Sequence, residues 1–252
     1  MTKIKNLISK SKKGMILTSV FLKNEGISPD LVKKYLNSGW LDKVGNQAYI
    51  LQGDQVDIFS ATYSLQSQLK KTIRVGGKSA LSYLGYAHFL AQRTEKIYLF
   101  GKPEDKLPVW FKRYEWDQEY IYQSPNLFNI DLKPFFNEYT LNGITASISG
   151  AELAMFEMLY LVPSSQTFQE SFLIVENLRT LRSDVLQVLL ENCNSVKVKR
   201  LAMYMLEENE QSYFKKLDLS KIDLGSGNRV IEMGGILDKK YKITVPRDLN
   251  DR

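Results

Sequence analysis

The sequence has almost none of the residues that zinc and disulfide chemistry require. Cys193 is the only cysteine and His88 the only histidine among 252 residues. An internal disulfide is therefore excluded, and so is a zinc site built from several thiolates or imidazoles. A catalytic Cys-His pair would need these two isolated residues to meet, so we expect Cys193 to be buried and His88 to be partly buried and hydrogen-bonded. The sequence predicts no catalytic residues, no metal site and no cofactor.

Long apolar runs are also lacking. No run of about 18 apolar residues is present to span a bilayer, and the start MTKIKNLISKSKK has no apolar signal-peptide core. Hydrophobic residues nevertheless make up 44% of the chain and aromatic residues 12%, which is enough for packed cores. We therefore expect a soluble, cytoplasmic protein, long enough for two domains.

Two glycine-containing stretches resemble phosphate-binding loops but depart from the patterns that such loops need. In VGGKSA, residues 75–80, the P-loop pattern requires a glycine where Thr72 stands. A turn before a helix starting near Ser79 is the simpler interpretation, although Lys78 could still meet an anion there. In DLGSGNRVIEMGG, residues 223–235, no Asp-x-Asp or Asp-x-Glu pair follows to hold magnesium as in nucleotidyltransferases. That stretch is better interpreted as an end piece joined to the strand-like ILDKKYKITVP.

The net positive charge is concentrated at the N-terminus. Residues 1–40 hold eight lysines and two carboxylates, a net charge of +6, and the whole chain, with 34 basic and 28 acidic residues, also carries +6. The remaining residues are therefore neutral. Because lysines attract nucleic-acid phosphates, a basic head on a neutral body favours a nucleic-acid reader, with a merely solvated lysine-rich face as the alternative.

The sequence GISPDLVKKYLNSGWLDKVGNQAYIL, residues 26–51, predicts a helix followed by a hairpin. Ser28 caps the helix, Pro29 occupies its first position, and Gly39 ends it. LDKV and AYIL then form two short strands around a Gly-Asn-Gln turn. With a helix from TKIKNLISKSKKG, a short strand from GMILT and a helix from SVFLKNEG before it, the order is that of a winged helix-turn-helix. Any small helical subdomain with a hairpin remains the alternative.

The rest of the chain predicts mixed α and β structure, so the fold class is α+β. We expect a winged helix-turn-helix at residues 1–52 and a larger mixed α/β domain at residues 53–252. In the second domain, VWFKRYEW and EYIYQS are strand-like, SSQTFQES is a loop, and VENLRTLRSDVLQVLLENC is one amphipathic helix. Arg179 and Arg182 in this helix, and Lys197 and Arg200 in the next, are three residues apart and would share a helix face. These four cations form either a second polyanion or partner surface or, as we prefer, a solvated face.

Four stretches in order resemble the AbiEi antitoxins, transcriptional regulators of type IV toxin-antitoxin systems. They are GMILTSVFLKNEGISPDLVKKYLNSGWLDKVGNQAYIL, VGGKSALSYLGYAHF, ENLRTLRSDVLQVLLENCNSVKVKRLAMYMLEE and IDLGSGNRVIEMGGILDKKYKITVPRDL. The resemblance implies a bacterial antitoxin whose winged helix binds inverted repeats in its own promoter and represses the operon. It also implies that the C-terminal domain counteracts a nucleotidyltransferase-like toxin, without requiring a stable complex with it.

The predicted DNA-binding residues follow from the helix, the hairpin and the N-terminal lysines. Asn37 is the candidate for reading a base edge, since lysines mostly contact phosphates. The full set is Ser28, Lys33, Lys34 and Asn37 of the second turn helix, Thr18, Ser19 and Lys23 of the helix before it, Lys43, Asn46 and Gln47 of the wing, and Lys3, Lys5, Lys10, Lys12 and Lys13 near the start. The alternative function is a nucleotide-processing enzyme in the central domain, with the winged helix as a protein-interaction module.

Overall fold

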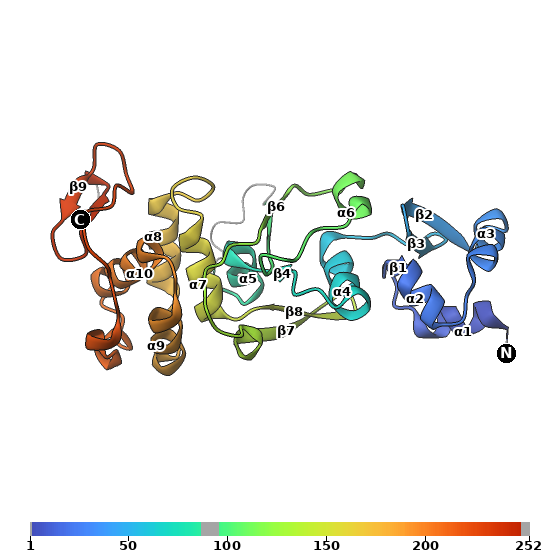
Figure 1. Ribbon diagram of the computed structural model, residues 1–252, viewed down its shortest axis with the longest axis horizontal. Helices are drawn as coiled ribbons and strands as arrows, with labels where there is room; N and C mark the ends of the chain where they lie inside the picture. Colours follow the sequence, from blue (N-terminus) through green and yellow to red (C-terminus); the bar gives the residue numbers. More distant parts are fainter. Residues whose placement is uncertain (1, 87–95, 248–252) are drawn as a thin grey trace. The chain divides into compact units, whose positions relative to one another are not determined.

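The computed structural model describes residues 2–86 and 96–247 and has the predicted α+β architecture (Figure 1). His88 lies outside the described residues. The chain separates into two compact units, each made of several segments. The first unit comprises the described residues among 1–75, 94–125 and 138–148, and the second those among 76–93, 126–137 and 149–252.

The first unit begins with the predicted winged helix-turn-helix. Its three strands form an antiparallel sheet in the order β1-β3-β2. The elements are α1 (Lys3–Lys10), β1 (Leu17–Thr18), α2 (Ser19–Asn24), α3 (Pro29–Asn37), β2 (Leu41–Gly45) and β3 (Ala48–Leu51).

Local signals account for the ends of α3. The Ser28 hydroxyl accepts a hydrogen bond from the Leu31 N–H at 3.3 Å, and Gly39 adopts a φ of +69°, the left-handed conformation that ends many helices. Val32 and Tyr35 are buried on the inner stripe of α3. They join a hydrophobic core whose other buried members are Leu7, Met15, Leu17, Leu22, Ile27 and Leu41.

Helix α4 (Ile58–Leu69) connects the winged helix to a larger sheet through two glutamine side chains. Gln68 accepts from the Thr18 N–H at 2.9 Å and donates to the Ile16 carbonyl at 2.6 Å, so it pairs with backbone beside β1. Gln66 exchanges hydrogen bonds of 2.8 and 2.9 Å with the backbone of Ser147. Because residues two apart point to nearly opposite sides of a helix, one helix can hold both partners.

The larger sheet has five strands in the order β6-β5-β4-β8-β7. Strand β4 is antiparallel to β5 and parallel to β8, and β5 is parallel to β6. The strands are β4 (Arg74–Val75), β5 (Ile97–Phe100), β6 (Tyr120–Gln123), β7 (Phe136–Leu141) and β8 (Ile144–Ser149). The sequence analysis did not predict β7, an edge strand with three exposed positions.

The prediction that VWFKRYEW is strand-like is wrong, because this stretch contains helix α6 (Val109–Arg113). Pro108 precedes the helix with a φ of −60°. Trp110 and Phe111 are adjacent in sequence and both buried. Neighbouring residues of a strand point to opposite faces, whereas a helix can turn both into one core.

The second unit is mainly helical. Its helices are α5 (Gly77–Tyr83), α7 (Ala151–Tyr160), α8 (Phe168–Asn177), α9 (Ser183–Asn192) and α10 (Val196–Glu208), with short 3-10 helices at Lys133–Phe135, Phe214–Lys216 and Leu219–Lys221. Strands β9 (Ile236–Asp238) and β10 (Ile243–Val245) form the antiparallel end piece, in which Tyr241, Ile243 and Val245 are buried. Cys193 is also buried, as predicted, and burial raises the pKa of its thiol to about 11.

Two predictions for the second unit are wrong. The stretch SSQTFQES is not all loop, because α8 begins at Phe168 and the Thr167 hydroxyl caps it by accepting from the Glu170 N–H at 3.2 Å. The predicted single helix from Val175 onward is broken between α8 and α9. Leu178 and Leu181 are both buried in the connection, so packing of these two side chains outweighs helix continuity.

No helix of the described residues is both long and apolar enough to cross a membrane.

Candidate nucleic-acid interface

The outer face of α3 carries three of the predicted DNA-binding residues. Lys33, Lys34 and Asn37 are exposed, while Val32 and Tyr35 point inward. Asp30 falls on the same stripe by helical spacing, but among the described residues it forms no ion pair with either lysine. The structure therefore presents two uncompensated cations and one amide on a single helix face.

Helix α2 contributes less than predicted. Thr18 is buried, and its hydroxyl caps α2 by accepting from the Phe21 N–H at 3.2 Å. Thr18 is therefore a structural residue that DNA cannot reach, which corrects its predicted role. Ser19 is half-buried and Lys23 is exposed. Both line a groove of about 540 Å³ whose other walls include Ser28 at the start of α3 and Tyr49 of the wing.

The wing presents all three of its predicted residues to solvent. Lys43, Asn46 and Gln47 are exposed, and Gln47 has a φ of +62° at the tight turn. The Ser19 N–H donates to the Gln47 carbonyl at 3.0 Å, so the wing tip is joined to the start of α2. This hydrogen bond fixes the wing beside the two turn helices.

The lysines at the N-terminus divide into two groups. Lys3 donates to the Gly26 carbonyl at 2.6 Å and Lys10 pairs with Glu25 at 2.6 Å, so both connect α1 to the turn between α2 and α3. The Lys12 ammonium lies 4.8 Å from the centre of the Tyr63 ring. Lys5 and Lys13 are exposed. Only the last two are left without such a contact among the described residues.

The structure also brings α6 to the wing, which the sequence analysis missed. Pro108, Val109 and Trp110 line a cavity of about 160 Å³ together with Asn46 and Gln47 of the wing tip. No signal in the sequence connects these segments, which are some 60 residues apart. Within α6 itself, the basic pair Lys112-Arg113 after the aromatic pair is the sequence feature that indicates a charged surface.

Lys197 and Arg200 share α10 as predicted, but this helix face points into the protein. Lys197 donates to the Tyr160 and Val162 carbonyls at 2.8 and 2.5 Å, and burial lowers the pKa of its ammonium. Arg200 is 1% exposed. Its guanidinium donates to the carbonyls of Leu224, Gly225, Gly227 and Lys242 at 2.7, 3.1, 2.6 and 3.1 Å. Burial, together with nearby Arg229, lowers the pKa of this guanidinium.

Arg179 and Arg182 do not share a helix face, because both lie in the connection between α8 and α9. The Arg182 Nε and Nη2 atoms donate to the Glu152 carboxylate at 3.1 and 3.2 Å, and its pKa is raised by this partner. Arg179 lines a surface depression beside Glu176, Glu208 and Glu210. Together, Arg179, Arg182, Lys197 and Arg200 do not form one exposed basic face.

The VGGKSA turn is filled by carboxylates of the protein itself. Helix α5 begins at Gly77, whose N–H donates to the buried Glu157 carboxylate at 3.0 Å. Lys78 pairs with Glu170 at 2.8 Å. The stretch is therefore a turn before a helix, as predicted, and carboxylates of the protein occupy the place where Lys78 could have met an anion.

Comparisons with known proteins identify the family of this chain. Residues 1–92 match the family described as "Transcriptional regulator, AbiEi antitoxin N-terminal domain", and residues 94–246 match "Transcriptional regulator, AbiEi antitoxin, Type IV TA system". Among solved structures, the RV2827C protein from Mycobacterium tuberculosis has a similar fold, with a TM-score of 0.60 at 16% identity over 95% of this chain and 88% of that one. No curated protein sequence matches the chain. The two family matches cover nearly the whole sequence, and the chain therefore belongs to the AbiEi family of antitoxin transcriptional regulators of type IV toxin-antitoxin systems.

Proposed function

We propose that this protein represses its own operon by binding promoter DNA with inverted repeats through residues 1–52. Helix α3 enters the major groove, Asn37 contacts a base edge, and the wing lies along the backbone. The rest of the chain counteracts a nucleotidyltransferase-like toxin, and this second task does not require a stable complex with the toxin.

The observation that carries the proposal is the position of the unpaired lysines. All of the net charge lies in residues 1–40. Among the described residues, no carboxylate pairs with Lys23 of α2, with Lys33 and Lys34 of α3, or with Lys43 of the wing, and Lys23 also lines the groove beside α3. A winged helix approaches DNA with these three elements, and lysines on them that have no carboxylate partner can bind backbone phosphates.

The test is a salt titration of binding to the DNA upstream of the gene, with a scrambled duplex for comparison. We expect the Lys33→Glu/Lys34→Glu variant to bind about 2–6 kcal/mol more weakly, since each lost charged hydrogen bond costs roughly 1–3 kcal/mol. The slope of log K against log salt should fall by about 1.8, since each phosphate contact contributes roughly 0.9.

The matched control is Lys215→Glu/Lys216→Glu, which makes the same change of charge at two exposed lysines of the second unit. It should retain nearly all of the affinity. Equal affinity of the α3 variant and wild type for the promoter would remove α3 from the interface.

A further inference from the structure

Helix α6 is in direct contact with the wing. A Cβ atom added to Gly45, at the end of β2, would lie 2.7 Å from the Trp110 Cβ and 3.1 Å from its Cα. Real Cβ atoms do not approach this closely, so glycine is required for the wing strand to lie against the helix backbone. Trp110 is itself buried, which keeps this part of α6 in place.

The exposed face of α6 borders the wing tip. Val109, Lys112 and Arg113 are three and four residues apart and therefore share one side of the helix. Val109 is 55% exposed and lines the cavity shared with Asn46 and Gln47. Lys112 and Arg113 are exposed as well. Their side of the helix therefore continues the surface of the wing.

Lys112 and Arg113 are two adjacent cations on this exposed side of α6. Among the described residues, no ion pair involves Lys112 or Arg113. Glu115 and Asp117 follow in the sequence, but neither forms an ion pair with them. The same condition, exposed and unpaired, holds for Lys33 and Lys34 of α3.

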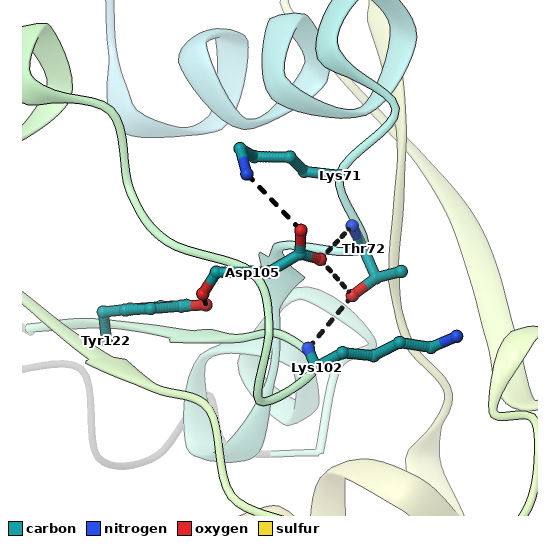
Figure 2. Close-up of polar contacts among 5 residues, drawn as sticks. All are labelled: Lys71, Thr72, Lys102, Asp105 and Tyr122. Atoms are coloured by element: carbon teal, nitrogen blue, oxygen red, sulfur yellow. Dashed lines mark hydrogen bonds and ion pairs between the residues drawn. The ribbon is translucent and has the colours of Figure 1, made fainter.

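The loop before α6 is held by a hydrogen-bond network centred on Asp105 (Figure 2). The Asp105 carboxylate accepts from the Thr72 N–H and hydroxyl at 2.7 and 2.6 Å. The Thr72 hydroxyl in turn accepts from the Lys102 N–H at 3.0 Å, and the Tyr122 hydroxyl donates to the Asp105 carbonyl at 2.5 Å. Thr72 lies two residues before β4 and Tyr122 belongs to β6, so the network anchors the loop to the sheet.

We infer that α6 is a second DNA-contacting element, whose Lys112 and Arg113 bind backbone phosphates next to those that the wing contacts. This inference rests on the proposed function. Phosphate is the ligand that fits, because an Arg and a Lys on one exposed helix side with no carboxylate partner provide several charged donors and no acceptor. The α6 pair extends the DNA site beyond the winged helix.

The experiment compares four full-length proteins on the upstream duplex over a range of salt concentrations. They are the wild type, Lys112→Glu/Arg113→Glu, Lys33→Glu/Lys34→Glu, and the control Lys215→Glu/Lys216→Glu. We expect the α6 variant to bind roughly ten- to a thousandfold more weakly than the control, with the salt slope reduced by about 1.8. Circular dichroism should show unchanged folding, because both α6 residues are exposed.

A second arm trims the duplex from each end in short steps. Trimming that removes only the phosphates assigned to α6, and keeps those that the wing contacts, should weaken the wild type and leave the α6 variant unaffected. If the α3 variant loses binding while the α6 variant equals the control, the inference fails and the proposed function stands. If the wild type shows no preference for the upstream duplex over a scrambled one, both fail.

Discussion

Replacing Arg200 by methionine should unfold the second unit more easily without touching the DNA site. The side chain is 1% exposed and donates to four backbone carbonyls. Three of them, Leu224, Gly225 and Gly227, belong to the 223–235 stretch, and the fourth is that of Lys242. It therefore joins α10 to the loop and to the segment before β10. Methionine keeps an unbranched apolar stem, although it is shorter than arginine, and removes every donor.

The expected loss in the free energy of unfolding follows from the four lost hydrogen bonds and from two effects that reduce it, rehydration of the carbonyls and the recovered desolvation cost of the guanidinium. An acceptor left unsatisfied costs roughly 1–3 kcal/mol, so four would cost about 4–12 kcal/mol if all stayed buried. Gly225, Gly227 and Lys242 are exposed residues, so their carbonyls can regain water, and removing a buried guanidinium also recovers its desolvation cost. We expect a net loss of about 3–5 kcal/mol in the free energy of unfolding of this unit. Arg200→Lys, with at most three donors on a shorter stem, should lose about 1–3 kcal/mol.

Two spectroscopic probes separate the two units. The three tryptophans, Trp40, Trp110 and Trp116, all belong to the first unit, whereas most of the long helices belong to the second. In urea, Arg200→Met should shift the far-UV circular dichroism transition to lower concentration and leave the tryptophan fluorescence transition near its wild-type position.

The matched control for this prediction is Arg229→Met, because Arg229 lies in the same loop and is exposed. It should change stability by no more than about 0.5 kcal/mol. If Arg200→Met left both transitions in place but weakened DNA binding, Arg200 would be a surface cation and the structural role assigned to it would be wrong.

Two further predictions concern the first unit. Burial alone would raise the pKa of Asp105, which is 13% exposed, but hydrogen bonds from Thr72 and the charge of Lys71 outweigh it and hold the pKa below its ordinary value of 3.8. A lowered pKa adds stability that is present above about pH 4 and is lost as the pH falls through the folded-state pKa. Asp105→Asn should therefore lower the free energy of unfolding by about 1–2 kcal/mol at pH 7 and by progressively less below pH 4. A loss that is independent of pH in urea unfolding would contradict this reasoning. Ser28→Ala removes the cap of α3 and should lower the free energy of unfolding by about 0.5–1 kcal/mol, the low end of the usual range for a lost cap because this hydrogen bond is 3.3 Å long. Ser28→Thr keeps the acceptor and should stay within about 0.5 kcal/mol of wild type in the same thermal unfolding experiment. Equal losses in both variants would show that the cap is not the cause.

The winged helix could be predicted from sequence because its determinants are local. Ser28, Pro29 and Gly39 act within one turn of their own positions, and the two-residue turn of the wing depends on the residues beside it. The α8 start was equally local, since Thr167 and Glu170 have the spacing of a capping box, and this signal was overlooked. In contrast, α6 and the break between α8 and α9 depend on which side chains enter a core. Trp110 and Phe111 are compatible with a strand by composition, and only the packing around them selects the helix.

Charge raises the same difficulty for the binding surfaces, because spacing shows which side chains share a helix face but not whether that face meets water or the core. Lys33 and Lys34 on α3 and Lys197 and Arg200 on α10 look alike in sequence, yet the first two are exposed and the last two are taken up by backbone carbonyls. The buried carboxylates Glu152 and Glu157 of the second unit also have internal partners. Glu152 pairs with Arg182, and Glu157 accepts a hydrogen bond from the Gly77 N–H. Internal pairing thus accounts for part of the charge of the neutral body and leaves the unpaired lysines of α3 and the wing facing solvent. The basic pair on α6 belongs with them, since among the described residues it is exposed and forms no ion pair, and Trp110 of the same helix packs against the wing. A DNA-binding surface assembled from both segments therefore has to be tested in the full-length chain, because residues 1–52 alone would lack α6.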